Sequence, residues 1–338
     1  MSNIELANGN HELVALHRDA ASGLTAIIAV HDRTLGPAIG GCRILPYRDL
    51  DAALDDVLRL SRGMTFKCAI AGIPYGGGKA VIIADPQTDK TPELLHAFGA
   101  FVESLGGRYI TSFDSGTTLD DVRTIGERTQ YAAGYADGYG NASESTAVGV
   151  FRCMQASWQS IAGADLAGVR VGIQGLGNVG SRLARLLIDA GAVLTVTDKD
   201  SSTAAELPSS WTTPEQIHAA DIDIFAPCAL GAVLNERTIP DIRARIVCGG
   251  ANNQLATTGD AERLRARGIV YCPDYLVNAG GIVELHHQHI RSNATALCEH
   301  LSSLADRLTE VLVQAQTENV DTVTIADRIV AERLGKTV

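Results

Sequence analysis

Several features that would place this chain in a membrane, a fibre or a nucleic-acid complex are missing from its sequence. No stretch approaches ~18 uncharged apolar residues, and no internal repeat or low-complexity run stands out among the 338 residues. Lysine and arginine number 28 against 39 acidic residues, and the resulting net charge of −11 would repel phosphate backbones and anionic headgroups. The sequence therefore predicts no nucleic-acid partner and no membrane association.

The cysteines do not form any pattern that suggests a disulfide framework or a zinc ribbon. There are seven of them, an odd number, and no two stand as a C-x-x-C pair. The first residues, MSNIELANGNHELV, also lack the basic and apolar segments of a secretion signal. We therefore expect a cytoplasmic protein that is neither exported nor inserted into a membrane.

The composition is that of a globular protein with room for two domains. Apolar residues make up 46% of the chain and charged residues 20%, which excludes a disordered tail and a coiled coil. At roughly 100 to 200 residues per domain, the length suggests two domains, each with its own core.

The first half of the chain is predicted to be mixed α/β. An alternating pattern predicts a strand over residues 24–30, and apolar residues at helical spacing predict a helix over residues 50–60. A second helix is predicted over residues 92–105, with Thr91 as its N-cap and a proline in its first turn.

The second half shows the alternation of short apolar runs and helical segments that is typical of a Rossmann-type, doubly wound parallel sheet. A helix over residues 146–161, capped by Ser145, is predicted to precede this alternation. The predicted strands cover residues 169–173, 193–197, 222–226, 245–248 and 269–271, and the predicted helices cover residues 179–190, 294–316 and 320–334.

Residues 131–145 are rich in Gly, Ser, Asn and Tyr and lack an apolar period, so we expect them to connect two lobes. We expect a first domain over residues 1–135, onto which the C-terminal helices at about 310–338 fold back. The second domain is expected over residues 136–309.

A dinucleotide-binding fingerprint lies in the second half. Gly175, Gly177 and Gly180 form G-x-G-x-x-G between a predicted strand and a predicted helix, which suits a tight turn, close approach of a pyrophosphate and close packing of helix on strand. Asp198 follows at the end of the next strand, where a carboxylate accepts ribose hydroxyls of NAD, although the neighbouring Lys199 leaves NADP open. The alternative is that the glycines only shape a turn, but a turn would not require a strand before them, a helix after them and an aspartate at the end of the next strand. The predicted cofactor loop comprises Gly175, Leu176, Gly177, Asn178, Val179 and Gly180.

Two lysines of the first half stand among apolar residues or glycines, where a solvated lysine is unusual. These are Lys67, in GMTFKCAIAG, and Lys79, which follows the glycines at 76–78. A buried lysine, or one beside a second ammonium, can act as a base near neutral pH. The alternative is that the glycines form a hairpin turn and Lys79 is its solvated end. Asp114, after a third short strand, is either part of the same site or an ordinary turn aspartate.

At this point the sequence resembles a known family. The segments that carry the resemblance include GPAIGGCR, LSRGMTFKCAIAGIPYGGGKAVI, QGLGNVG, GGANNQL and YCPDYLVNAGG. They are similar to those of the glutamate/leucine/phenylalanine/valine dehydrogenase family, and above all to its leucine, valine, phenylalanine and tryptophan branch. The match extends from about Gly36 to the C-terminal ADRIVAERL.

The resemblance implies NAD-dependent, reversible oxidative deamination of an apolar L-amino acid to the 2-oxo acid and ammonia. It implies that Lys67 holds the substrate carboxylate, that Lys79 is the catalytic base and that Asp114 assists proton transfer. Thr146 and Asn252 would lie near the nicotinamide. Further substrate-binding residues implied in this way are Gly40, Gly41, Met64, Ile282 and Leu285. The family also implies a homo-oligomer built through the first lobe, with a hinge at residues 131–145.

Several alternatives stay open on the sequence alone. The positions expected to line the pocket carry no cation, which disfavours glutamate as substrate but does not choose among apolar side chains. Another NAD-linked dehydrogenase on a two-lobed fold, or a non-catalytic NAD or amino-acid sensor, would share the cofactor signal. His286 and His289 share a helical face, but without a third ligand at fixed spacing we predict no metal site.

Overall fold

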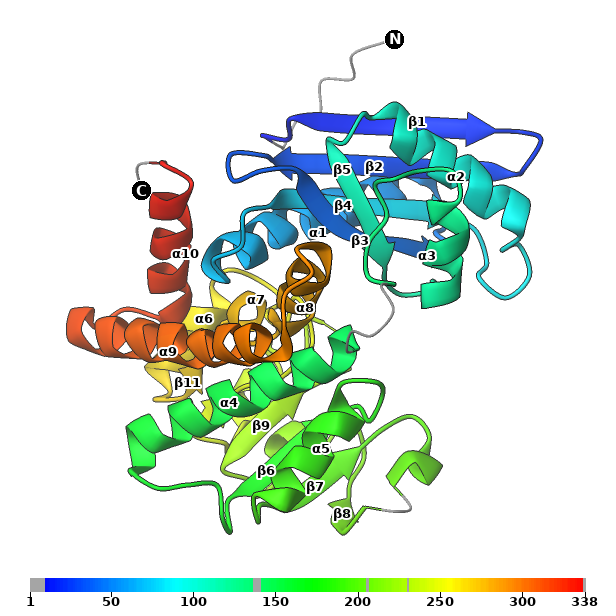
Figure 1. The fold of residues 1–338 in the computed structure, drawn as a ribbon. Helices are drawn as coiled ribbons and strands as arrows, with labels where there is room; N and C mark the ends of the chain where they lie inside the picture. The colour runs from blue at the N-terminus through cyan, green and yellow to red at the C-terminus, as the bar shows by residue number, and fades with distance from the viewer. Residues whose placement is uncertain (1–9, 136–140, 205–206, 230, 337–338) are drawn as a thin grey trace. The chain divides into compact units, whose positions relative to one another are not determined.

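The computed structural model describes residues 10–135, 141–204, 207–229 and 231–336. The chain divides into two compact units, Met1–Tyr139 and Gly140–Val338, and each has its own sheet (Figure 1). The division lies close to the boundary expected at residue 135. Residues 136–140 of the predicted connection lie outside the described residues.

The first unit contains a mixed five-stranded sheet in the order β1-β2-β4-β3-β5. Neighbours are antiparallel from β1 to β4, whereas β3 runs parallel to both β4 and β5. This confirms the mixed α/β prediction. The strands are β1 (Leu13–Asp19), β2 (Leu24–Asp32), β3 (Ala38–Leu45), β4 (Gly76–Ile83) and β5 (Tyr109–Phe113), and the helices are α1 (Leu50–Ile70), α2 (Pro92–Ser104) and α3 (Leu119–Gly126).

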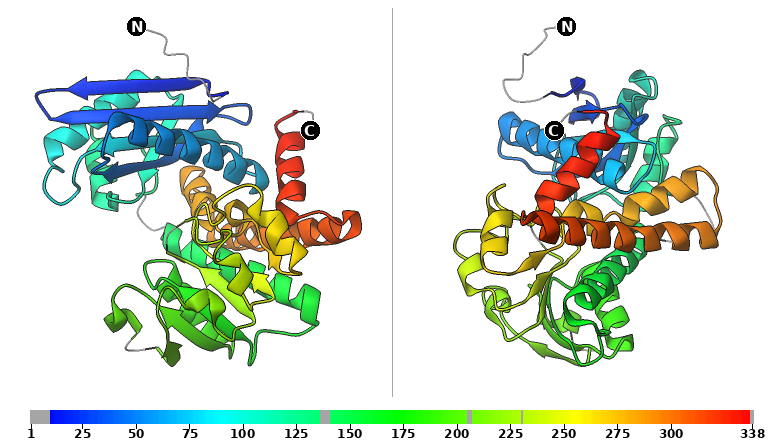
Figure 2. Two further views of the ribbon diagram at one scale, coloured as in Figure 1. Left: turned by 180° about the vertical axis from the view of Figure 1, so that it is seen from behind. Right: turned by 90° about the vertical axis from the view of Figure 1, so that its left-hand side faces the viewer.

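Alternate residues of β2 pack on two different helices. Ile28 belongs to the core that contains Phe98 of α2, whereas Ile27 belongs to the core that contains Val57 of α1. Because successive side chains of a strand point to opposite faces, α1 and α2 cover opposite faces of this sheet (Figure 2).

Helix α1 begins behind Asp49, whose side chain accepts the Ala52 N–H at 2.8 Å, and it is longer than predicted. The prediction ended at residue 60, but the helix continues to Ile70. The added turns bury Thr65, Cys68 and Ile70, so packing against the sheet outweighs the weaker helix propensities after residue 60.

The glycines at 76–78 are not a hairpin turn, because they form the first part of β4. A Cβ atom added to Gly77 would lie 2.1 Å from the backbone nitrogen of Thr65, and one added to Gly78 would lie 2.6 Å from the ring of Tyr109. These glycines therefore allow α1 and β5 to approach β4 closely, and Lys79 lies inside the strand.

The second unit contains a parallel six-stranded sheet in the order β11-β10-β9-β6-β7-β8. From β6 the chain builds outward through β7 and β8 on one side and through β9 to β11 on the other. This is the Rossmann arrangement, as predicted. The strands are β6 (Arg170–Gln174), β7 (Val193–Thr197), β8 (Ser209–Trp211), β9 (Ile224–Pro227), β10 (Ile246–Val247) and β11 (Val270–Tyr271).

Helices cover both faces of this sheet. Val247 packs in a core with Leu264 of α6, whereas the next residue, Cys248, contacts the backbone oxygen of Val150 in α4. The helices are α4 (Ala142–Ala162), α5 (Gly180–Asp189), α6 (Asp260–Ala266), α7 (Asp274–Val277), α8 (Gly280–His289), α9 (Ala294–Glu318) and α10 (Thr322–Arg333).

The two C-terminal helices are grouped with the second unit. Helix α9 lies alongside α4, and α10 packs on α9 (Figure 1). Residues 310–338 were expected to fold back on the first domain, but the contact division places them within Gly140–Val338. The reason is the long apolar stripe of α9, which is buried against α4 and α8.

Helix α4 starts earlier than expected. Ser145 was predicted to cap it, but the cap is Asn141, whose side chain accepts the Ser143 N–H at 2.8 Å. Ser145 lies in the first turn instead, where its hydroxyl donates to the carboxylate of Glu284 at 2.6 Å.

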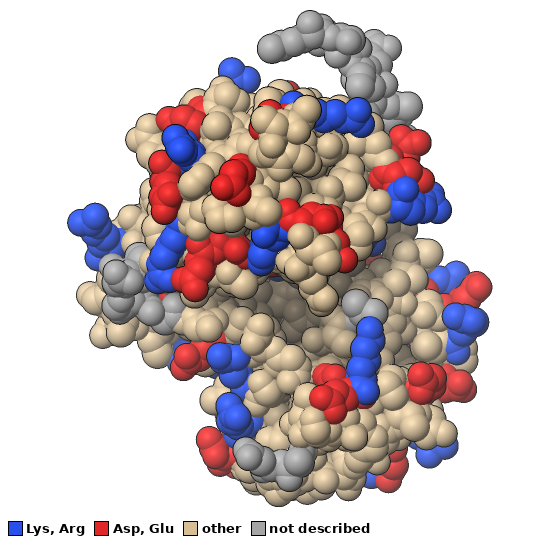
Figure 3. All heavy atoms as spheres, turned by 90° about the vertical axis from the view of Figure 1, so that its right-hand side faces the viewer, with Lys and Arg blue, Asp and Glu red and all other residues tan. Residues whose placement is uncertain are grey.

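In the part of the chain that the structure describes, no helix combines the length and apolarity needed to span a bilayer. On the face drawn in Figure 3, acidic and basic side chains are interspersed. Each of the seven cysteines is a free thiol.

Candidate active site

Three charged side chains of the first unit meet above the parallel strands of its sheet. Lys79 of β4 places Nζ 3.2 Å from Oδ1 of Asp114, and Arg43 of β3 donates from Nε to Oδ2 of the same carboxylate at 2.7 Å. The exposed fraction of the side chain is 7% for Lys79, 17% for Arg43 and 19% for Asp114. The carboxylate is therefore held between two cations in a largely buried setting.

The parallel pairing of β3 and β5 brings Asp114 to this place. Gly41 pairs with Ser112, so the residue that follows β5 comes beside β3, and a Cβ on Gly41 would lie 2.8 Å from the Cβ of Asp114. Thr117 fixes the turn, because its hydroxyl oxygen accepts the Asp114 N–H at 2.7 Å. A side chain at position 41 would thus displace the carboxylate.

The other predicted residues of this unit lie around the same strands. A Cβ on Gly40 would lie 1.9 Å from the Gly78 oxygen and 3.4 Å from Cγ of Met64, which shows that α1 passes over β3 at this point. Lys67 follows Met64 by three positions on α1 and so shares its side of the helix. The structure therefore brings Gly40, Gly41, Met64, Lys79 and Asp114 together, with Lys67 on the adjoining helical turn.

The two cations decide the ionisation of Asp114. Burial acts to raise the pKa of this carboxyl, but the charges of Lys79 and Arg43, with their hydrogen bonds, lower it to about 2. Burial acts to lower the pKa of Arg43, but the carboxylates of Asp114 and Asp56 hold it above its ordinary value. Asp114 is consequently an anion throughout the neutral range.

Arg43 was not among the site residues predicted from the sequence. An available signal was its position inside the apolar strand AIGGCRIL, since a charged side chain in a buried strand needs an anionic partner. The partners, Asp56 and Asp114, are distant in the sequence, so the pairing itself was not readable.

In the second unit, the loop between β6 and α5 has the geometry of the fingerprint. Gly175 has φ +97, which a side chain would strain, and a Cβ on Gly180 would lie 1.9 Å from the Gly175 oxygen. A Cβ on Gly177 would meet nothing within 4 Å, so open space lies beside this backbone. Asn178 and Val179 lead into α5, whose N-terminus has no side-chain cap.

Asp198 adjoins this loop at the end of β7. Its Oδ2 accepts the Leu176 N–H at 2.6 Å, which ties the loop to the neighbouring strand. Loops after other strands lie against the fingerprint as well, since Gly175 is packed on Ala229 after β9, and Gly250 after β10 is packed on Val179. The site therefore lies at the carboxyl ends of the strands, where the order of the parallel sheet reverses.

Thr146 and Asn252 occupy different surroundings in the same unit. The Thr146 hydroxyl donates to the Ala142 oxygen at 2.7 Å, and a Cβ on Gly281 would lie 2.9 Å from this hydroxyl. Asn252 accepts a hydrogen bond from Asn278 at 2.9 Å.

Helix α8 carries the predicted pocket residues Ile282 and Leu285, which are 5% and 8% exposed. The buried Glu284 between them is hydrogen-bonded, because it accepts from Ser145 at 2.6 Å and from Gln288 at 3.2 Å. This carboxylate therefore links α4 to α8.

The histidines that follow on α8 form a cluster with α9. His287 Nε2 lies 3.0 Å from Nδ1 of His300, and the ring of His286 contacts both. Burial, with the neighbouring histidines, lowers the pKa of His286 to about 4. Among the described residues, no group of three or more His, Cys, Asp or Glu side chains has an arrangement that would hold a metal ion.

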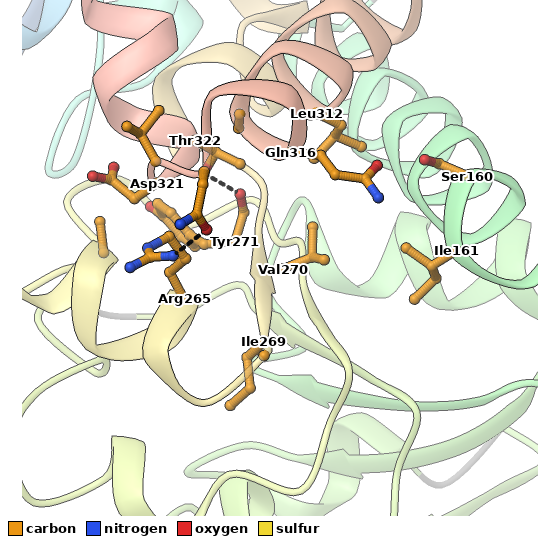
Figure 4. A pocket seen from close by; sticks show the side chains of 15 residues that line it. Ser160, Ile161, Arg265, Ile269, Val270, Tyr271, Leu312, Gln316, Asp321 and Thr322 are labelled. Carbon is orange, nitrogen blue, oxygen red and sulfur yellow. Dashed lines mark hydrogen bonds between the residues drawn. The ribbon is translucent and has the colours of Figure 1, made fainter.

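A cavity of about 570 Å³ lies elsewhere in the second unit, between β11, the end of α9 and the start of α10 (Figure 4). Two hydrogen bonds join polar groups at this cavity: Arg265 donates to Asn319 at 2.8 Å, and the Thr322 hydroxyl donates to the Tyr271 oxygen at 2.6 Å. The predicted site residues are not among those that line it.

Comparison with known proteins identifies the family. Residues 12–131 match "Glu/Leu/Phe/Val dehydrogenase, dimerisation domain", and residues 138–207 and 202–336 match "Glutamate/Leucine/Phenylalanine/Valine dehydrogenase". The phenylalanine dehydrogenase of Caldalkalibacillus thermarum (strain TA2.A1) is 43% identical over 96% of this chain and 92% of its own length. The leucine dehydrogenase of Geobacillus stearothermophilus is 42% identical over 96% and 91%.

A solved structure agrees with these matches. The crystal structure of L-tryptophan dehydrogenase from Nostoc punctiforme superposes with a TM-score of 0.81 at 42% identity, covering 96% of both chains. Both halves of the chain are thus accounted for, the first by the dimerisation domain and the second by the dinucleotide-binding fold. The chain belongs to the glutamate/leucine/phenylalanine/valine dehydrogenase family.

Proposed function

We propose that this chain catalyses the NAD-dependent oxidative deamination of an apolar L-amino acid to the 2-oxo acid and ammonia, and the reverse amination. The observation that carries the proposal is the buried contact of 3.2 Å between Lys79 and Asp114, in a chain that also holds a dinucleotide fingerprint. Its relatives named above act on phenylalanine, leucine and tryptophan.

The second unit fits a dinucleotide. The open space beside Gly177, the free N-terminus of α5 and the carboxylate of Asp198 are the features that a pyrophosphate and a ribose require. Residues 175–180 would hold the pyrophosphate, Asp198 the adenosine ribose, and Thr146 and Asn252 the nicotinamide end. We propose NAD rather than NADP, because Asp198 would repel a 2′-phosphate. When bound, the nicotinamide supplies the acceptor for the hydride that leaves Cα.

The first unit supplies the groups that bind substrate and move protons. The Lys67 ammonium pairs with the α-carboxylate and fixes the position of Cα. After hydride loss, water attacks the iminium carbon of the substrate, and Lys79 acts as the base that takes a proton from that water. Asp114, which stays ionised, accepts a hydrogen bond from Lys79 and orients its Nζ. Lys79 then returns its proton to the amino group of the carbinolamine, the C–N bond breaks with release of ammonia, and the hydroxyl proton passes to Lys79 as the 2-oxo acid forms.

The residues proposed to contact the substrate side chain are Ile39, Gly40 and Ser112 in the first unit and, separately, Ile282 and Leu285 in the second. None of the five carries a cation, so a side-chain carboxylate would have no partner among them. Glu284 does not change this view, because its carboxylate already accepts two hydrogen bonds from within the second unit. An apolar amino acid is therefore the proposed substrate class.

We further propose that the protein is a cytoplasmic homo-oligomer. The match of residues 12–131 to a dimerisation domain supports assembly through the first unit. The seven free thiols are consistent with a reducing compartment.

A panel of L-amino acids tests the proposal. The purified protein is mixed with each amino acid and either NAD or NADP at alkaline pH, and the absorbance of the reduced nicotinamide is followed. Turnover is expected with leucine, valine, phenylalanine or tryptophan and with NAD. Turnover with 2-hydroxy acids alone would indicate a different dehydrogenase, and binding of NAD without turnover of any amino acid would indicate a sensor.

A further inference from the structure

Arg43 is a buried charge to which the proposed reaction assigns no task. Its Nε donates to Oδ2 of Asp114 at 2.7 Å, and its Nη1 donates to Oδ2 of Asp56 at 2.9 Å. One guanidinium thus joins a carboxylate of the proposed proton-transfer pair to a carboxylate of α1. Burial of an arginine in such a strand is costly unless both sides of its fork are bonded, and here they are.

We propose that Arg43 is a positioning residue that holds Asp114 in the ionised state and turns its second oxygen toward Lys79. This inference rests on the proposed function, because Lys79 and Asp114 are its proton-transfer pair. With Oδ2 bonded to Arg43, only Oδ1 is left to face Nζ of Lys79, at 3.2 Å. The arginine therefore decides which carboxylate oxygen the lysine meets.

The anchor on α1 is itself fixed. Asp56 is 14% exposed and accepts hydrogen bonds from the Tyr47 hydroxyl at 2.7 Å and from Arg59 at 3.1 Å, besides that from Arg43. With three donors on its two oxygens, this carboxylate has little freedom to rotate. Asp56 consequently holds the guanidinium of Arg43 in a fixed position beside Asp114.

The charges that face Asp114 come from two strands. Lys79 approaches from β4 and Arg43 from β3, and the buried thiol of Cys42 lies close by on β3. On the side of α3, Asp121 is neutralised by Lys90 at 2.7 Å. Removal of Arg43 would leave Lys79 as the single cation bonded to Asp114 among the described residues. The pKa of Asp114 would then rise from about 2, because burial would be opposed by one charge in place of two.

The substitution Arg43→Gln tests this role through its separate effects on kcat and KM. We expect kcat to fall more than KM rises, because a displaced Asp114 no longer orients Lys79 while Lys67 still binds the substrate carboxylate. Arg43→Lys, which keeps the positive charge, should lower kcat less than Arg43→Gln. Arg48→Gln is the matched control, because Arg48 is 83% exposed and pairs with Asp49 only at the surface. Its kcat and KM should equal those of the unchanged protein.

Two further measurements keep the outcomes distinct. A cooperative urea unfolding transition reports whether Arg43→Gln is folded. If it is not folded, Asp56→Asn decides: removal of the anchor should lower kcat more than it raises KM, and an unchanged kcat would overturn the proposal. A folded Arg43→Gln with an unchanged kcat would also overturn it.

The role of Arg43 can also be tested if the proposed function is wrong. If the unchanged protein oxidises no amino acid, urea unfolding from pH 7 to pH 3 still tests the effect of Arg43 on Asp114. The stability of Arg43→Gln should fall less between pH 7 and pH 3 than that of the unchanged protein, because its Asp114 pKa lies closer to the unfolded value of about 4. Equal pH dependence of unfolding in the two proteins would contradict the inference, whatever reaction the protein performs.

Discussion

At the scale of single residues, the charge on Asp114 is set by its neighbours and not by its own position in a turn. Lys79 and Arg43 reach it from two strands, and their charges overcome the effect of burial. The sequence permitted a prediction for Lys79 and Asp114, because each stands in an unusual context. The role of Arg43 depends on partners 13 and 71 positions away along the chain, which no local pattern indicates.

The depressed pKa of Asp114 makes a prediction about stability. A carboxyl whose pKa is lower in the folded state stabilises the protein above its unfolded pKa of about 4, and this contribution is lost as the pH falls toward about 2. Asp114→Asn should therefore cost on the order of 2 kcal/mol of unfolding free energy at pH 7. The cost should shrink by about half by pH 3.

Urea unfolding at several pH values measures this cost. The exposed Asp120, which is 87% exposed and pairs with Arg123, provides the control, since Asp120→Asn should change stability little at any pH. A cost for Asp114→Asn that does not depend on pH between 7 and 3 would show that the carboxyl is not held ionised by its neighbours.

At the scale of elements, the existence and type of most helices and strands could be predicted, whereas their ends could not. Helix α1 extends ten residues beyond the predicted end at residue 60, and α4 begins before its predicted cap, Ser145. In both places a tertiary contact overrides the local signal: burial against the sheet extends α1, and Glu284 takes the hydroxyl of Ser145. The glycines at 76–78 were ambiguous because close packing and turning both require glycine.

The loop between β6 and α5 predicts that two of its glycines respond differently to the same substitution. In Gly177→Ala the added methyl group meets no protein atom, so stability should be unchanged while the Kd for NADH rises about tenfold or more. In Gly180→Ala the methyl group would lie 1.9 Å from the Gly175 oxygen, so the fold of the loop itself should suffer.

Thermal unfolding without cofactor and fluorescence titration with NADH separate these two effects. The expected result is a normal melting temperature with weak binding for Gly177→Ala, and a lowered melting temperature for Gly180→Ala. Tight NADH binding by Gly177→Ala would mean that no pyrophosphate passes beside this backbone.

At the scale of the whole molecule, the two-domain organisation followed from length and from the change of pattern near residue 131. The parallel sheet of the second unit was predictable because each βαβ step has a local signature. Which unit the C-terminal helices join was not predictable, because an apolar helix stripe does not reveal which surface covers it. The assignment of functions to the two domains stays a prediction.

The proposed assembly gives a prediction at this scale. Light scattering after size-exclusion chromatography should give a mass that is an even multiple of 35.6 kDa. A monomer at micromolar concentration would contradict assembly through the first unit. It would leave the cofactor fingerprint of the second unit unaffected.

The central claim is that Lys79 is the base of the reaction and that the dinucleotide binds to the second unit. Lys79→Ala tests this claim most directly. We expect kcat for oxidative deamination to fall on the order of 10²–10⁴-fold, while the Kd for NADH stays unchanged. Lys90→Ala is the control, because it also removes a lysine that is ion-paired to an aspartate in the first unit, with Asp121 at 2.7 Å, and it should retain activity. A folded Lys79→Ala variant that turns over its amino acid at the original rate would contradict the account.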